Sequence, residues 1–106
     1  MSEWVTVAKV GEIAINTYRV VDVDGTHIAL FNLDGQYYAI EDMCTHDAGQ
    51  LTGGAIENGN IVCPRHGAKF CIRTGAALTA PAYEPTATFP VRVENEQIQV
   101  RDTRWD

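Results

Sequence analysis

The chain has 106 residues, which suits one domain with a single hydrophobic core. Apolar residues make up 45% of it, a share that is typical of globular proteins and excludes a disordered chain. Its 14 acidic and 8 basic residues give a formal net charge of -6, which argues against a nucleic-acid partner because phosphates attract Lys and Arg. No apolar run reaches the roughly eighteen residues of a membrane span. The opening "MSEWVTVAKVGEIA" has no basic segment followed by an apolar one, so we expect no secretory signal and a cytoplasmic protein.

Strand-like segments dominate the chain from one end to the other. Alternating or β-branched stretches occupy 4–8, 17–23, 26–32, 36–41, 55–57, 60–63, 68–72, 86–94 and 97–101. Short turns, among them Asp24-Gly25, Asn58-Gly59 and Asn95-Glu96, predict hairpins between several of these stretches. The only candidate for helical structure is a weak turn over 9–13. About nine short strands predict an all-β fold, either a sandwich or a small barrel.

Two cysteine–histidine pairs stand out in "MCTHDAGQLTGGAIENGNIVCPRHG". Cys44 and His46 form the first pair, Cys63 and His66 form the second, and 16 residues separate the two pairs. Each pair lies where a predicted strand gives way to a loop, and rigid strands often carry functional loops in this way. The third cysteine, Cys71, has no His or Cys at ligand spacing, so we expect a buried, inert thiol there.

The residues alone leave more than one explanation for these pairs. Buried cysteines beside surface histidines at such tight spacing would be a coincidence. A structural zinc ion takes four Cys and His ligands, although zinc fingers usually group each ligand type together. An iron–sulfur cluster with two Cys on one iron and two His on the other gives the interleaved order a reason, because each loop then contributes one ligand to each iron.

The motif resembles the signature of Rieske-type 2Fe–2S proteins. The segments "AKFCIRTG" and "ALTAPAYEPTATFPVRVENEQIQV" extend the resemblance to the small Rieske ferredoxins of bacterial ring-hydroxylating dioxygenase systems. It implies one Rieske 2Fe–2S cluster with Cys44 and Cys63 on the inner iron, and with His46 and His66 on the outer iron. It also implies a single Rieske domain over 1–106, in which an antiparallel β-sandwich base carries a small cluster-binding subdomain at about 42–82. A proline-bearing loop like 79–85 covers the cluster in that family.

The function implied by the resemblance is that of a soluble one-electron carrier. Such a carrier takes electrons from an NAD(P)H-dependent flavin ferredoxin reductase and passes them to a terminal Rieske non-haem iron oxygenase that attacks aromatic rings. We expect no enzymatic activity, because four protein ligands leave no open metal position and no nucleophile lies in a recognisable motif. The alternatives are a small Rieske-like subunit of a nitrite reductase and a zinc-stabilised interaction module.

The resemblance also predicts a low redox potential. High-potential Rieske proteins carry a disulfide between the two ligand loops, but Gly49 and Arg65 occupy the matching positions here. Those proteins also carry a Ser and a Tyr whose hydroxyls donate to sulfur, and Ala68 and Phe70 stand in their places. Because such donors stabilise the reduced state, their loss predicts a potential near the bottom of the Rieske range, at roughly -150 mV.

Overall fold

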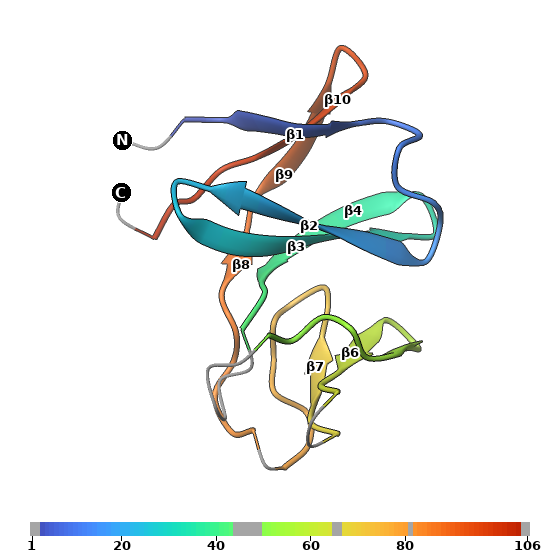
Figure 1. The fold of residues 1–106 in the computed structure, drawn as a ribbon, viewed down its shortest axis with the longest axis vertical. Helices are drawn as coiled ribbons and strands as arrows, with labels where there is room; N and C mark the ends of the chain where they lie inside the picture. Colours follow the sequence, from blue (N-terminus) through green and yellow to red (C-terminus); the bar gives the residue numbers. More distant parts are fainter. Residues whose placement is uncertain (1–2, 44–49, 65–66, 81, 105–106) are drawn as a thin grey trace.

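The structure is a computed structural model that describes residues 3–43, 50–64, 67–80 and 82–104 (Figure 1). Every regular element in these ranges is a β-strand, so none of them holds a helix that could cross a membrane. The strands are β1 (Val5–Lys9), β2 (Thr17–Val23), β3 (Thr26–Leu33), β4 (Gln36–Glu41), β5 (Ile56–Glu57), β6 (Asn60–Val62), β7 (Lys69–Cys71), β8 (Thr88–Phe89), β9 (Val91–Glu94) and β10 (Gln97–Val100). Neighbouring strands pair antiparallel throughout. The predicted all-β class is therefore confirmed.

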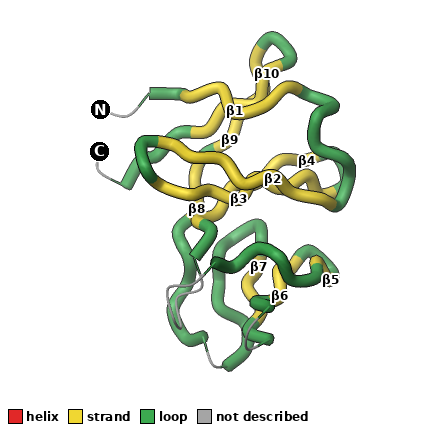
Figure 2. The backbone as a smooth tube through the Cα atoms, viewed as in Figure 1, coloured by secondary structure: helices red, strands yellow, loops and turns green. Residues whose placement is uncertain are grey.

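The strands form three sheets that follow one another along the long axis of the molecule (Figures 1 and 2). The terminal sheet has the strand order β1-β10-β9, and the central sheet has the order β2-β3-β4-β8. The small sheet has the order β5-β6-β7 and lies at the opposite end from the chain termini (Figure 1). The central sheet is thus the middle of three layers.

Strand β3 is buried on both of its faces. All six residues from Ile28 to Leu33 are buried, and successive side chains of a strand point to opposite faces. Ile28 and Leu30 join the core between the central and terminal sheets, together with Ile98 and Val100. On the other face, Ala29, Phe31 and Leu33 join a second core that includes residues of the small sheet. The apolar run "IALFNL" therefore marks a strand that serves two cores at once.

Four two-residue turns connect neighbouring strands, and all four have the backbone that a tight hairpin requires. Their members are Asp24-Gly25, Asp34-Gly35, Asn58-Gly59 and Asn95-Glu96, and φ is positive at both residues of each turn. Type I′ turns have this conformation, and their twist matches that of the flanking strands. The hairpins predicted from these dipeptides are confirmed by the strand pairing on either side.

The segment 86–94 was predicted as one strand, and this prediction is wrong at Pro90. Strand β8 pairs with β4 in the central sheet, whereas β9 pairs with β10 in the terminal sheet. Proline has no backbone N–H to donate to a ladder, so the chain leaves one sheet here and enters the other. Its carbonyl accepts a hydrogen bond from the Arg101 N–H at 3.2 Å. The crossing ties the two sheets of the sandwich together near the end of the chain.

Candidate metal centre

Cys63 is the one predicted ligand within the described residues; Cys44, His46 and His66 lie outside them. Cys63 follows β6 directly, is 1% exposed and belongs to the buried cluster that holds Leu51. No three His, Cys, Asp or Glu side chains in the described ranges lie close enough together to hold a metal ion. The structure therefore fixes the surroundings of one ligand and the ends of both ligand loops.

The second ligand loop is closed at its base by two backbone hydrogen bonds. The Cys63 N–H donates to the Ala68 carbonyl at 2.7 Å, and the Cys63 carbonyl accepts from the Gly67 N–H at 3.0 Å. Gly67 has a φ of 74°, a conformation that glycine adopts without steric cost. The loop that carries His66 thus begins at a buried thiol and returns to the small sheet within a few residues.

The first ligand loop is closed by the side chain of Asp42. This carboxylate is 9% exposed and accepts hydrogen bonds from the N–H groups of Leu51 and Thr52, at 3.0 and 2.7 Å. The Thr52 hydroxyl donates to its other oxygen at 2.9 Å. Hydrogen bonds to a carboxylate are stronger than those between neutral groups. Asp42 therefore joins the two ends of the segment that carries Cys44 and His46.

The bases of the two loops lie against each other. A Cβ atom added to Gly54 would lie 1.8 Å from the Val62 carbonyl oxygen and 3.4 Å from the Pro64 nitrogen. The backbone after the first loop therefore packs directly on the residues that flank Cys63, and only glycine permits this approach. This contact holds the two ligand loops side by side at their bases.

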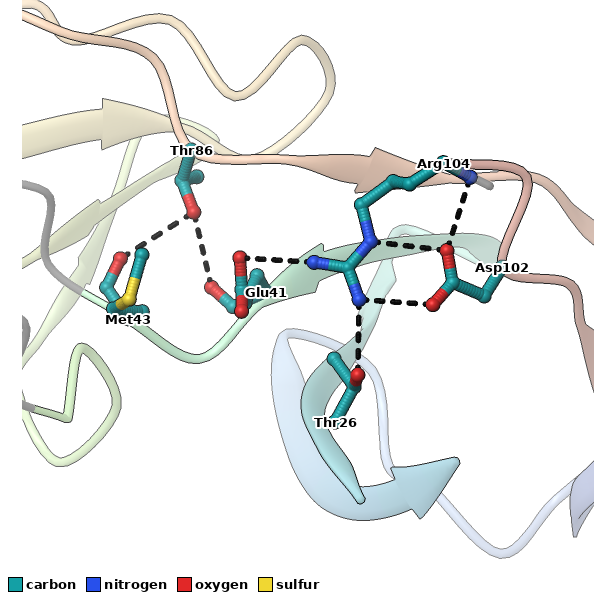
Figure 3. Close-up of polar contacts among 6 residues, drawn as sticks. All are labelled: Thr26, Glu41, Met43, Thr86, Asp102 and Arg104. Carbon is teal, nitrogen blue, oxygen red and sulfur yellow. Dashed lines mark hydrogen bonds and ion pairs between the residues drawn. The ribbon is translucent and has the colours of Figure 1, made fainter. Parts of the chain in front are cut away.

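A third segment, 76–86, is attached to both loops. The Lys69 N–H donates to the Thr79 hydroxyl at 2.9 Å, and the Leu78 N–H donates to the Lys69 carbonyl at 2.8 Å. At its other end, the buried Thr86 hydroxyl lies 3.2 Å from the Glu41 carbonyl and 3.3 Å from the Met43 carbonyl (Figure 3). The segment thus spans from the strand after the second loop to the strand before the first.

Cys71 differs from its prediction as a buried, inert thiol. Its side chain is half-buried, and it faces Asn60 across the ladder between β6 and β7. Burial raises the pKa of the thiol, but hydrogen bonds with Thr74 and with the Arg73 backbone, together with the charge of Arg73, outweigh it, so the pKa lies below its ordinary value. Cys71 belongs to no metal-ligand group among the described residues.

Asp42 and Thr86, two side chains that anchor the loop ends, were not predicted from the sequence. The available signal at Asp42 was an acidic residue at the end of a strand pattern, immediately before Met43 and Cys44. Thr86 gave no signal, since it meets its partners from more than 40 residues away. Both contacts depend on the folded arrangement of three segments.

The carboxylate of Asp42 gives a stability prediction. Asp42→Ala leaves three buried donors without an acceptor, and we expect the free energy of unfolding to fall by about 2–4 kcal/mol. Asp42→Asn keeps one oxygen for the two N–H groups and can donate its amide to the Thr52 hydroxyl, so its loss should stay near 1 kcal/mol. Urea unfolding followed by circular dichroism measures both variants. Equal losses for Ala and Asn would contradict the role of this acceptor.

The family model of the Rieske [2Fe-2S] domain matches residues 3–90. The naphthalene 1,2-dioxygenase ferredoxin component of Pseudomonas aeruginosa is 33% identical over 92% of this chain and 94% of its own length. The 3-phenylpropionate/cinnamic acid dioxygenase ferredoxin subunit of Shigella boydii is 46% identical over 67% of this chain and 68% of its own length.

Solved ferredoxin structures share the fold over nearly the whole chain. The carbazole 1,9a-dioxygenase ferredoxin of Nocardioides aromaticivorans IC177 superposes with a TM-score of 0.87, 29% identity and coverage of 92% of this chain and 95% of its own. A ferredoxin of Sphingomonas yanoikuyae B1 gives a TM-score of 0.86, 29% identity and coverage of 94% and 99%. The buried Cys63 thiol at the end of a strand is a suitable ligand for iron in a cluster. The chain therefore belongs to the Rieske [2Fe-2S] family.

Proposed function

We propose that this chain is the ferredoxin component of a ring-hydroxylating dioxygenase system. The observation that carries this proposal is the match to a dioxygenase ferredoxin over 92% of this chain and 94% of that protein. The predicted cofactor, one Rieske-type 2Fe–2S cluster, is confirmed by the family match. The prediction of an electron-transfer protein rather than an enzyme is confirmed by the ferredoxin relatives.

The ligands in this proposal are Cys44 and Cys63 on the inner iron, and His46 and His66 on the outer iron. A cluster-binding subdomain at about 42–82, within a single domain over 1–106, would then present both loops. When bound, the cluster supplies a one-electron redox couple. The burial of Cys63 supports its place on the inner iron, because the apolar residues around it exclude water from that side.

The partners in this proposal are a flavin-dependent ferredoxin reductase that uses NAD(P)H and a terminal Rieske non-haem iron oxygenase. A solved complex of reduced oxygenase with oxidised ferredoxin in carbazole 1,9a-dioxygenase supports the second partner, since its matched chain is 32% identical to this one with a TM-score of 0.86. We further place the protein in the cytoplasm, where a reducing environment keeps thiols such as Cys63 and Cys71 free. Recovery of the chain from another cell fraction would contradict this placement.

The third segment offers a contact surface for the oxygenase. Tyr83 is 84% exposed and Leu78 is 49% exposed, although both are large apolar side chains. They flank a stretch that is anchored at Thr79 and by the buried Ala82. Exposed aromatic and aliphatic side chains on a fixed backbone are typical of protein contact sites. We propose that Tyr83 and Leu78 dock on the oxygenase beside the ligand loops.

The ligand assignment predicts which substitutions remove the cluster. His46→Ala should lose the Rieske electron paramagnetic resonance spectrum, and Cys63→Ala should lose cluster assembly, because each removes a ligand. His27→Ala and Cys71→Ala are matched controls: His27 is an exposed histidine near Asp22, and Cys71 lies outside the motif. Both controls should keep the wild-type spectrum. A colourless zinc protein, or a His46→Ala protein with an unchanged spectrum, would show the assignment to be wrong.

The apolar surroundings of the second ligand loop predict that an added hydrogen-bond donor would raise the midpoint potential of the cluster. Ala68 and Phe70 are fully buried in the same cluster as Cys63, and neither side chain can donate a hydrogen bond. If the new hydroxyl of Ala68→Ser reaches sulfur, one added hydrogen bond should raise the midpoint potential by roughly 30–60 mV. Voltammetry measures this shift, with Ala14→Ser on the exposed N-terminal loop as the control. A positive midpoint for the wild type at neutral pH would overturn the low-potential assignment.

The exposed tyrosine gives a kinetic prediction. Tyr83→Ala should slow the reduction of the cognate oxygenase by the reduced protein roughly three- to tenfold, because a docking contact is lost. The midpoint potential should stay unchanged. Ile15, in the turn before β2, is another exposed apolar side chain, with 61% of it exposed. Ile15→Ala should leave the rate of oxygenase reduction unchanged. Stopped-flow spectrophotometry measures both variants, and a wild-type rate for Tyr83→Ala would remove this residue from the contact.

A further inference from the structure

The C-terminal tail is fastened to the central sheet by the side chain of Arg104. Its guanidinium donates to Asp102 at 3.0 Å from Nε and 2.8 Å from Nη2, and Nη2 also donates to the Thr26 hydroxyl at 2.9 Å (Figure 3). Its Nη1 atom lies 3.4 Å from a Glu41 carboxylate oxygen. The guanidinium carbon lies 5.1 Å from the centre of the Phe89 ring. One side chain therefore connects the tail to the start of β3 and the end of β4.

These contacts are better protected from water than the ion pairs Arg19–Glu12, Lys69–Glu57 and Arg92–Glu94, whose side chains are all more than 40% exposed. The side chains of Arg104, Glu41 and Asp102 are 27%, 22% and 12% exposed. Charge-assisted hydrogen bonds in partly buried positions contribute more to stability than exposed pairs do. Hydrogen bonds from Arg104 hold the pKa of the Asp102 carboxyl below its ordinary value, so Asp102 stays charged at neutral pH. The tail is thus held by a persistent cluster of charges.

Glu41 is the last residue of β4 and directly precedes Asp42, which closes the first ligand loop. Its N–H donates to the Ala87 carbonyl at 2.9 Å, and its carbonyl lies within hydrogen-bond distance of the Thr86 hydroxyl. The backbone of Glu41 is therefore held by Thr86, the last residue of the third segment, and by Ala87 directly after it. Its side chain is held by Arg104, which comes from a tail beyond the residues 3–90 that the family model matches.

We propose that Arg104 is a positioning residue for the cluster, which acts through Glu41 on the strand end from which the first ligand loop departs. This inference rests on the proposed function, in which Cys44 and His46 of that loop are ligands. With Arg104 in place, the end of β4 is held through both the backbone and the side chain of Glu41. Without Arg104, the side-chain hold on Glu41 is lost, and local opening of the chain at the end of β4, up to Met43, becomes more frequent. Because the ligand Cys44 directly follows Met43 in the sequence, we expect Arg104 to slow the loss of the cluster.

The test measures the rate at which the holoprotein loses its visible absorption in the presence of an iron chelator, well below the unfolding temperature. We expect Arg104→Gln to lose its cluster roughly three to ten times faster than the wild type, a change typical of one removed charge-assisted contact. Glu41→Gln should show a similar increase. Because both residues act through one contact, the double variant should be no faster than the faster single variant.

Arg92 provides the matched control. It also pairs with a carboxylate, that of Glu94 at 3.1 Å, and lies over an aromatic ring, that of Trp4 at 4.5 Å, but it belongs to the terminal sheet. Arg92→Gln removes the same charge and should leave the rate of cluster loss within about twofold of the wild type. The electron paramagnetic resonance spectrum of the reduced cluster should broaden in Arg104→Gln and stay unchanged in Arg92→Gln.

Four results would count against the proposal. Equal rates of cluster loss in Arg104→Gln and Arg92→Gln would overturn it, and so would independent, multiplying effects of Arg104→Gln and Glu41→Gln. An unchanged resonance spectrum in Arg104→Gln would reduce Arg104 to a general contributor to stability. A wild-type protein without a Rieske spectrum would overturn the proposed function as well, whereas the other results leave that function intact.

Discussion

The burial of β3 on both faces is the constraint on which the rest of the molecule depends. Because side chains alternate along the strand, Ile28 and Leu30 complete the sandwich core while Phe31 and Leu33 build the core beneath the small sheet. The central sheet must therefore be covered on both sides, by the terminal sheet and by the loops around Cys63. Since β4 pairs with β3 along its whole length, the point where the chain leaves β4 is fixed by the same requirement.

Between β4 and β5, and again between β7 and β8, the described residues have few ladder partners, and polar side chains hold the chain there. Irregular backbone that packs on a core still needs partners for its N–H and C=O groups. Asp42 accepts from two backbone N–H groups of the returning first loop, and Thr79 accepts from the strand after the second loop. Thr86 donates to the strand end itself. Each of these residues joins two segments of the chain, over separations of 9 to 45 residues, so a small number of polar contacts holds the ends of the ligand loops.

The contrast between strands held by backbone ladders and loops held by side chains explains which features were predictable from the sequence. Strands and hairpins follow from local signals: alternation with a period of two, and dipeptides such as Asn58-Gly59 that favour positive φ. The ligand motif was predictable for the same reason, because each Cys–His pair lies within a few residues of sequence. The sheet change at Pro90 was not, because alternation continues through the proline while its hydrogen-bond partners change. Arg104 depends on Thr26 and Glu41, which are distant along the chain, and Asp42 depends on donors 9 and 10 residues away. A single sequence does not show which acid meets which donor.

The same architecture separates two demands on the proposed electron carrier. One side of the site must stay dry and fixed, and Cys63 meets this demand at the end of β6, where it is almost wholly buried. The other side must be open to a partner, and Tyr83 meets this demand on a segment whose ends are tied down. Prearranged donors and dipoles need not reorganise when charge changes nearby. Side chains such as Asp42, fixed by several hydrogen bonds, therefore hold the ends of the first ligand loop in place while Tyr83 stays exposed.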